Sequence, residues 1–237
     1  MTESVETKRI ALVTGASRGI GRAAAVALAK AGCHVILSAR TGGALEEVDD
    51  EITAAGGTSS ILKLNLAHSE KLDALGPTLY ARWQRLDVLV AAAGILGRLG
   101  PLGHCPTEEW DQAMAINLTA NWRLIRSLDP LLRRSGAGRA LFVTSRAVSN
   151  PRAYWGPYAV SKAGLEALVK TYAEEVRNTP VRVNLIDPGP TRTKMRAQAY
   201  PGEDAATVKP PEAIAPLIVR LVSPECALHG QVISAED

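Results

Sequence analysis

The sequence predicts an α/β protein built on a doubly wound sheet of about seven parallel strands, with helices on both faces. Short apolar runs alternate with helix-patterned segments along nearly the whole chain. The runs are apolar at consecutive positions, which is typical of strands that are buried on both faces of a parallel sheet. A chain of 237 residues has room for seven such strands in a single domain, residues 1–237, and leaves none for a second domain.

The strands and helices follow from the local pattern. The expected strands are residues 9–14, 34–38, 60–65, 87–92, 139–145, 181–187 and 231–234. Between them, apolar residues recur every three or four positions, as on one face of a helix. The clearest repeats are Ile20, Ala24 and Leu28; Leu72, Leu75, Leu79 and Trp83; and Leu165, Leu168, Val169, Tyr172 and Val176. Residues 188–211 are irregular, and a loop of that length in a compact domain is usually functional. We expect residues 190–210 to form a lid over a substrate.

Composition excludes several classes of protein. Apolar residues at 46% and charged residues at 22% are ordinary globular values, so the bulk of the chain is expected to fold. The 27 basic and 24 acidic residues are spread along the chain, which predicts no nucleic-acid partner. The longest apolar stretch, residues 88–96, is about half a membrane helix, and the first eight residues lack the apolar run of a signal peptide. Three scattered cysteines and four scattered histidines predict no metal site and a cytoplasmic location.

A glycine-rich turn follows the first expected strand directly. Residues 14–21 read TGASRGIG, and a helical pattern begins within them. Glycines at this spacing let the backbone turn tightly and approach a pyrophosphate, whose charge then sits at the positive end of the helix. The turn therefore predicts a Rossmann-type dinucleotide site formed by Gly15, Ser17, Arg18, Gly19, Ile20 and Gly21. The alternative is a plain strand–helix turn.

A tyrosine and a lysine four residues apart form the second pattern. Tyr158 and Lys162 would share one face of a helix, and Ser145 ends the fifth expected strand. A nearby ammonium favours the phenolate, so we expect Lys162 to lower the pKa of Tyr158 and make it a proton donor and acceptor at neutral pH. Ser145 would hydrogen-bond the same substrate oxygen. The alternative is a core tyrosine with a lysine stem packed beside it.

Together these motifs resemble the short-chain dehydrogenases/reductases, in the short branch of that family, over nearly the whole chain. Residues 158–162 match its Y-x-x-S-K signature, and Asn117 in INLTAN matches its catalytic asparagine. The phrases INLTANWRLIRSL and RTKMRAQAYPGED are most similar to a bacterial YciK-like branch. The resemblance implies catalysis by Ser145, Tyr158, Lys162 and Asn117, with Asn117 fixing a water that links Lys162 to solvent.

The resemblance also implies which residues bind a nicotinamide cofactor. Asn65 and Leu66 would contact adenine, and the remaining contacts would come from Ala93, Gly94, Tyr158, Lys162, Pro188, Gly189, Thr191 and Thr193. The second expected strand leads into Ala39 and Arg40 where NAD enzymes carry an acid. Because a guanidinium binds a 2′-phosphate in bidentate geometry, Arg40 and Arg18 predict NADP(H) rather than NAD(H).

Two positions depart from the family pattern. Ala91 and Ala92 replace two asparagines after the fourth strand, so adenosine contacts there would fall to the backbone. The sequence ends at Asp237 without the D-G-G tail that is common in the family.

Three functions remain open on the sequence: a carbonyl reductase or alcohol dehydrogenase acting on a small molecule, a sugar-nucleotide epimerase or dehydratase on the same scaffold, and a cofactor-sensing protein without chemistry. The retained Tyr158 and Lys162 favour the first. The long helical patterns at residues 107–135 and 157–178 resemble the pair that joins family members across a twofold axis, which predicts a homodimer or homotetramer.

Overall fold

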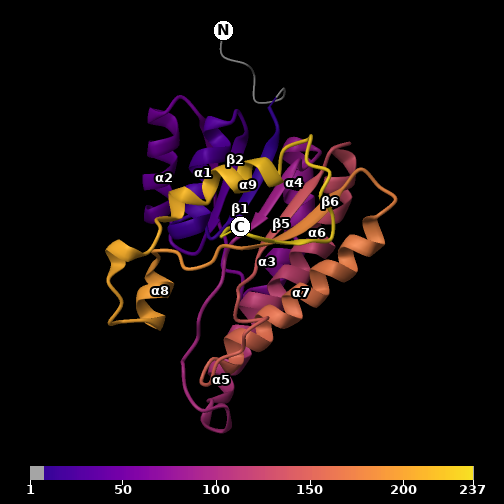
Figure 1. Cartoon of the computed structure of the whole chain (residues 1–237). Coiled ribbons are helices and arrows are strands. Elements are labelled where there is room, and N and C mark those ends of the chain that lie inside the picture. Colours follow the sequence, from indigo (N-terminus) through magenta and orange to yellow (C-terminus); the bar gives the residue numbers. More distant parts are fainter. Residues whose placement is uncertain (1–7, 237) are drawn as a thin grey trace.

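The computed structural model describes residues 8–236, and they form one seven-stranded sheet with helices on both faces (Figure 1). All neighbouring strands run parallel, in the order β3-β2-β1-β4-β5-β6-β7. The strands are β1 (Ile10–Thr14), β2 (His34–Ala39), β3 (Thr58–Lys63), β4 (Val88–Ala91), β5 (Arg139–Val143), β6 (Arg182–Asp187) and β7 (Val232–Ser234). The predicted fold class is confirmed. Residues 1–7 and Asp237, on which the expectations about a signal peptide and a tail rest, lie outside the described part.

The third strand lies two residues earlier than expected. The sequence pattern places it at residues 60–65, whereas β3 spans Thr58–Lys63. β3 is at the edge of the sheet, where polar residues are tolerated. His34 on β2 explains the shift, because its two ring nitrogens hydrogen-bond the hydroxyls of Thr58 (3.1 Å) and Ser60 (3.0 Å). These contacts draw polar residues into the strand that an apolar pattern does not detect.

The helices form two layers. One face of the sheet carries α1 (Gly19–Lys30), α2 (Gly43–Ala54) and α9 (Ala215–Leu221); the other carries α4 (Leu75–Trp83), α6 (Ala120–Arg134) and α7 (Gly156–Val176). The short α3 (Ser69–Asp73) packs on α6. No helix among residues 8–236 is long and apolar enough to span a lipid bilayer.

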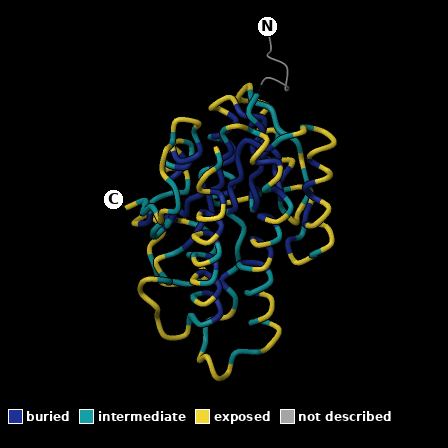
Figure 2. The backbone as a smooth tube through the Cα atoms, turned by 90° about the vertical axis from the view of Figure 1, so that its right-hand side faces the viewer, coloured by how far each residue is buried: buried dark blue, intermediate teal, exposed yellow. Residues whose placement is uncertain are grey.

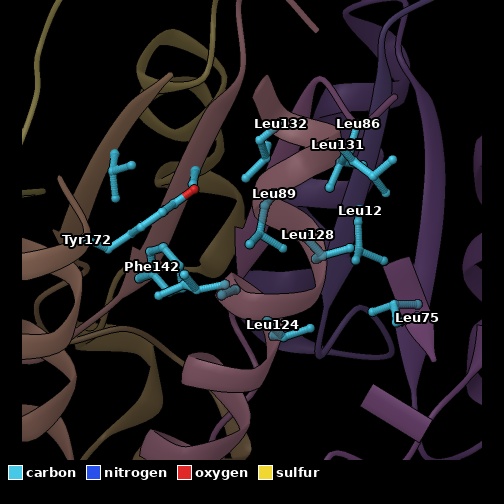
Figure 3. Packing of buried hydrophobic residues seen from close by; sticks show 14 of the residues in the cluster. Leu12, Leu75, Leu86, Leu89, Leu124, Leu128, Leu131, Leu132, Phe142 and Tyr172 are labelled. Carbon is cyan, nitrogen blue, oxygen red and sulfur yellow. The ribbon is translucent and has the colours of Figure 1, made fainter. Parts of the chain in front are cut away.

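Consecutive apolar residues in the strands serve both layers. Leu12 packs with Leu89, Phe142, Leu124 and Leu128 on the α6 side (Figure 3). Its neighbour Val13 belongs to the cluster under α1 and α2 on the opposite face. Successive strand residues point to opposite faces, so a sheet covered on both sides favours apolar residues at consecutive positions.

Two segments near the carboxyl ends of the strands differ from the sequence expectation. Residues 107–135 form not one helix but α5 (Thr107–Met114), a π-helical turn (Ala115–Thr119) and α6. Residues 188–211 are not irregular throughout, because they contain α8 (Lys194–Ala199). In Figure 1, α5 and the first turns of α7 extend beyond the sheet, and Figure 2 shows that this extension is mostly exposed or half-buried.

Candidate active site

A cleft of about 1230 Å³ opens at the carboxyl ends of the strands. It lies where the strand order reverses between β1 and β4, which is the position where open α/β sheets bind their ligands. All the site residues expected from the sequence line this cleft except one. The exception is Asn117, which is fully buried behind its wall.

The glycine turn has the geometry of a phosphate-binding loop. Gly15 and Gly19 have φ values of +68° and +56°, which side-chain-bearing residues rarely adopt. At Gly21, a Cβ atom would lie 2.2 Å from the carbonyl oxygen of Gly15. Arg18 provides no side-chain cap to α1, so the first N–H groups of this helix are available to an anion. The turn can therefore bring backbone donors close to a pyrophosphate.

The turn is anchored to the segment that follows β4. Ala93 donates its N–H to the Thr14 hydroxyl at 3.2 Å, and a Cβ on Gly15 would lie 2.9 Å from the Ala93 Cα. Ala92 and Ala93 line the cleft with little side chain. The replacement of asparagines at Ala91 and Ala92 thus leaves backbone groups facing the cofactor half of the cleft.

α7 brings Tyr158 and Lys162 to the cleft wall formed by the end of β5. The Lys162 ammonium donates a hydrogen bond of 2.7 Å to the Val143 carbonyl and lies 5.9 Å from the centre of the Tyr158 ring. Ser145, two residues beyond Val143, hydrogen-bonds Tyr158. The spacing of Tyr158 and Lys162 in the sequence therefore predicts their proximity correctly.

Burial dominates the protonation of this pair. It lowers the pKa of Lys162 from 10.5 to about 8, because the charged ammonium loses solvation. Burial also raises the pKa of Tyr158, and the hydrogen bond from Ser145 only partly opposes this shift. Within the protein itself, desolvation thus outweighs the lowering of the tyrosine pKa that the sequence argument attributes to Lys162.

Asn117 ties the loop after β4 to α7. Its side-chain amide donates to the Ile95 carbonyl at 2.9 Å and to the Ser161 hydroxyl at 3.0 Å, and its side-chain oxygen accepts from the Ile95 N–H at 2.9 Å. Asn117 lies in the π-helical turn between α5 and α6. Asn121, buried and not expected from the sequence, donates to the backbone carbonyl of Asn117 at 2.8 Å. Asn117 thereby fixes the wall behind Lys162.

Residues 190–210 lie across the cleft and touch three of its walls. Thr193 packs against Gly19 of the glycine turn, and a Cβ added to Gly19 would lie 3.2 Å from the Thr193 methyl group. Gln198 donates to the Gly97 carbonyl at 3.5 Å, and Tyr200 accepts a hydrogen bond of 2.6 Å from Arg152. The segment expected to act as a lid therefore bridges the cofactor half and the opposite rim.

The comparisons with known proteins agree with this geometry. The family model for short chain dehydrogenase matches residues 9–204. The chain belongs to the short chain dehydrogenase family. It is 39% identical to the uncharacterized oxidoreductase YciK of Escherichia coli K12 over 90% of this chain and 86% of that protein. It is also 36% identical to a 3-oxoacyl-[acyl-carrier-protein] reductase of Synechocystis, covering 80% and 76% of the two chains.

A solved short chain dehydrogenase from Shigella flexneri, complexed with NADP, superimposes with a TM-score of 0.92. It is 37% identical to this chain, and the match covers 97% of each. These findings confirm the family resemblance and the oxidoreductase class that the sequence motifs predict.

Ser38 lines the cleft of this dehydrogenase, although no sequence motif predicts it there. Ser38, at the end of β2, is buried, and its hydroxyl has no hydrogen-bond partner among residues 8–236. Tyr200 lies in the segment expected to act as the lid, and its ring is tilted against that of Trp155 with the ring centres 5.8 Å apart.

Replacing Gly21 by alanine should abolish dinucleotide binding. The new Cβ would meet the Gly15 carbonyl and force the phosphate-binding turn out of shape. Gly42→Ala is the matched control, since a Cβ there meets nothing within 4 Å. Nicotinamide fluorescence titration measures binding, and thermal melting of both variants checks the fold. Wild-type affinity in Gly21→Ala would contradict this role of the turn.

Proposed function

We propose that this short chain dehydrogenase is an NADP(H)-dependent oxidoreductase that interconverts a carbonyl group and a secondary alcohol on a small molecule. The observation that carries the proposal is the meeting of Ser145, Tyr158 and Lys162 on one wall of the cleft whose other half holds the glycine turn. One domain, residues 1–237, would hold both cofactor and substrate, with residues 190–210 as the lid.

The cofactor half of the cleft fits NADP(H). Arg18 and Arg40 line it, and Ala39 stands where an acid would bind a free ribose hydroxyl. The unpartnered hydroxyl of Ser38 lies on the same strand end, where a phosphate oxygen could satisfy it. The NADP complex of the Shigella flexneri relative supports this choice. Asn65 and Leu66 would line the adenine, and Gly94, Pro188, Gly189 and Thr191 the nicotinamide half.

When bound in the cleft, a nicotinamide cofactor would supply the hydride chemistry, and the residues of this chain would bind the substrate oxygen and move its proton. Tyr158 donates its phenolic proton to the carbonyl oxygen, and its raised pKa keeps that proton on the ring until the oxygen becomes basic. Ser145 donates a hydrogen bond to the same oxygen. Lys162 has a pKa of about 8, so it is charged at neutral pH and stabilises the phenolate left behind. Asn117 holds the wall that positions Lys162.

Tyr158→Phe should lower turnover by at least about a hundredfold, because the proton donor is removed while the ring remains. NADPH affinity should stay within a few-fold of wild type. Carbonyl-dependent loss of NADPH absorbance measures turnover, and Tyr80→Phe, an exposed tyrosine on α4, is the control. More than a tenth of wild-type activity in Tyr158→Phe would overturn the assignment.

NADPH should bind more tightly than NADH by about ten- to a hundredfold, since a charge-assisted hydrogen bond contributes about 1.5–3 kcal/mol before screening. Replacing Ala39 by Asp and Arg40 by Leu together should invert the preference, because the acid repels the phosphate and accepts from the ribose hydroxyl. Dissociation constants of NADPH and NADH at fixed salt test the preference. Arg177→Leu, an exposed residue just after the end of α7, is the control. Equal NADH binding by the unaltered protein would contradict it.

A homodimer or homotetramer formed through α6 and α7 remains a prediction. The outer faces of these helices expose Trp122 (43%) and Val160 (44%), which a second copy would cover. Light scattering at micromolar concentration tests it, and a monomer of 25.1 kDa would refute it.

A cytoplasmic location likewise stays a prediction from the sequence.

A further inference from the structure

The cleft is far more basic than the protein as a whole. Among the described residues that line it, nine are Arg or Lys, and two, Glu109 and Asp187, are acidic. The complete chain holds 27 basic and 24 acidic residues, so a third of its positive charge gathers around one cleft. Such a concentration raises the local potential and attracts anions. The cofactor phosphates account for the part near the glycine turn.

The cofactor phosphates do not explain two arginines at the opposite end of the cleft. Arg98 and Arg152 are exposed, and neither pairs with a carboxylate among residues 8–236. By contrast, Arg146 and Arg196, which also line this end, are paired with Glu236 and Glu203.

The loops that carry Arg98 and Arg152 meet at the cleft mouth. Gly97 accepts a hydrogen bond from Gln198 of α8, and Gly100 donates one of 3.0 Å to the Tyr154 carbonyl. Arg98 therefore lies between the lid and the loop of Arg152. The guanidinium of Arg152 has five N–H donors, and one of them donates to the Tyr200 hydroxyl. The others can donate to a ligand. Both arginines can bind an anion there.

A wall of aromatic rings connects these arginines to the catalytic tyrosine. Trp155 meets the Tyr158 ring edge-on at 5.9 Å and the Tyr200 ring at 5.8 Å. Trp155 and Tyr158 line the same cleft, so a substrate whose carbonyl accepts from the Tyr158 hydroxyl has Trp155 within reach of a substituent. Flat rings pack favourably on aromatic faces and edges, which gives this wall a preference for planar groups.

We propose, building on the function above, that the substrate is an aromatic ketone or aldehyde that carries an acidic group. Its ring packs against the wall that Trp155 and Tyr200 form together, its carbonyl oxygen meets Tyr158, and its carboxylate or other acid group binds Arg98 and Arg152. Glu109, which lines the cleft from α5, pairs with neither arginine and leaves them to the ligand. Trp155, Arg98 and Arg152 are then the residues that determine specificity.

Four ketones separate the contribution of the ring from that of the charge: 4-acetylbenzoate, 4-methylacetophenone, 4-oxopentanoate and 2-pentanone. The kcat/KM for 4-acetylbenzoate, followed as NADPH loss, should exceed that of each of the others by at least about tenfold. Arg98→Leu combined with Arg152→Leu should remove the preference for the acid and keep that for the ring. Trp155→Leu should remove the preference for the ring and keep that for the acid. Arg220→Leu, exposed on α9 outside the cleft, is the matched control.

A binding measurement keeps the inference separate from catalysis. In calorimetry with the NADP-loaded protein, planar terephthalate should bind at least about tenfold more tightly than non-planar cyclohexane-1,4-dicarboxylate of equal charge. The double arginine variant should lose this binding, with its melting temperature showing that it is folded. The inference is overturned if the kcat/KM for 4-oxopentanoate or 4-methylacetophenone equals that for 4-acetylbenzoate. It is also overturned if the protein binds terephthalate no more tightly than cyclohexane-1,4-dicarboxylate. Terephthalate binding without reduction of any ketone would instead refute the proposed function.

Discussion

Burial of the parallel sheet on both faces is the constraint on which the rest of this structure depends. Helices must cover each face, so every strand is followed by a crossover, and all carboxyl ends reach the same edge. The reversal of strand order between β1 and β4 then puts the crossovers before and after it on opposite faces and leaves an opening between them. The glycine turn, the Ser145 loop and the segment after β6 share one cleft for this reason.

The same burial sets the chemistry of the cleft wall. Lys162 and Tyr158 are almost completely enclosed, so solvent does little to screen either group. Desolvation moves their pKa values in opposite directions, that of Lys162 toward neutrality and that of Tyr158 away from it. The Val143 carbonyl compensates the lysine with a single hydrogen bond. An enclosed ammonium of this kind interacts strongly with any negative charge that forms nearby.

The cleft has two differently built ends. Near the glycine turn, backbone N–H groups and short side chains leave room for a cofactor to approach closely. At the other end, long and aromatic side chains from three loops meet, and hydrogen bonds between those loops hold them together. The first end depends on backbone geometry, which is fixed by a few glycines, whereas the second depends on the identity of side chains carried by loops. This division explains how one scaffold can keep its cofactor while its substrate changes.

The sequence by itself determined the sheet, the position of the glycine turn and the pairing of Tyr158 with Lys162, because each rests on short-range spacing. Consecutive apolar residues report two-sided burial, and a four-residue step on a helix brings two side chains together wherever that helix packs. Only the tertiary structure decided the extent of β3, the π-helical turn around Asn117 and the meeting of Trp155 with Tyr200. These depend on contacts between residues far apart in the chain, such as Arg152 with Tyr200, which no local pattern encodes. Whether Lys162 lies in water or in the protein interior, and hence its pKa, was decided in the same way, since burial is a property of the packed molecule.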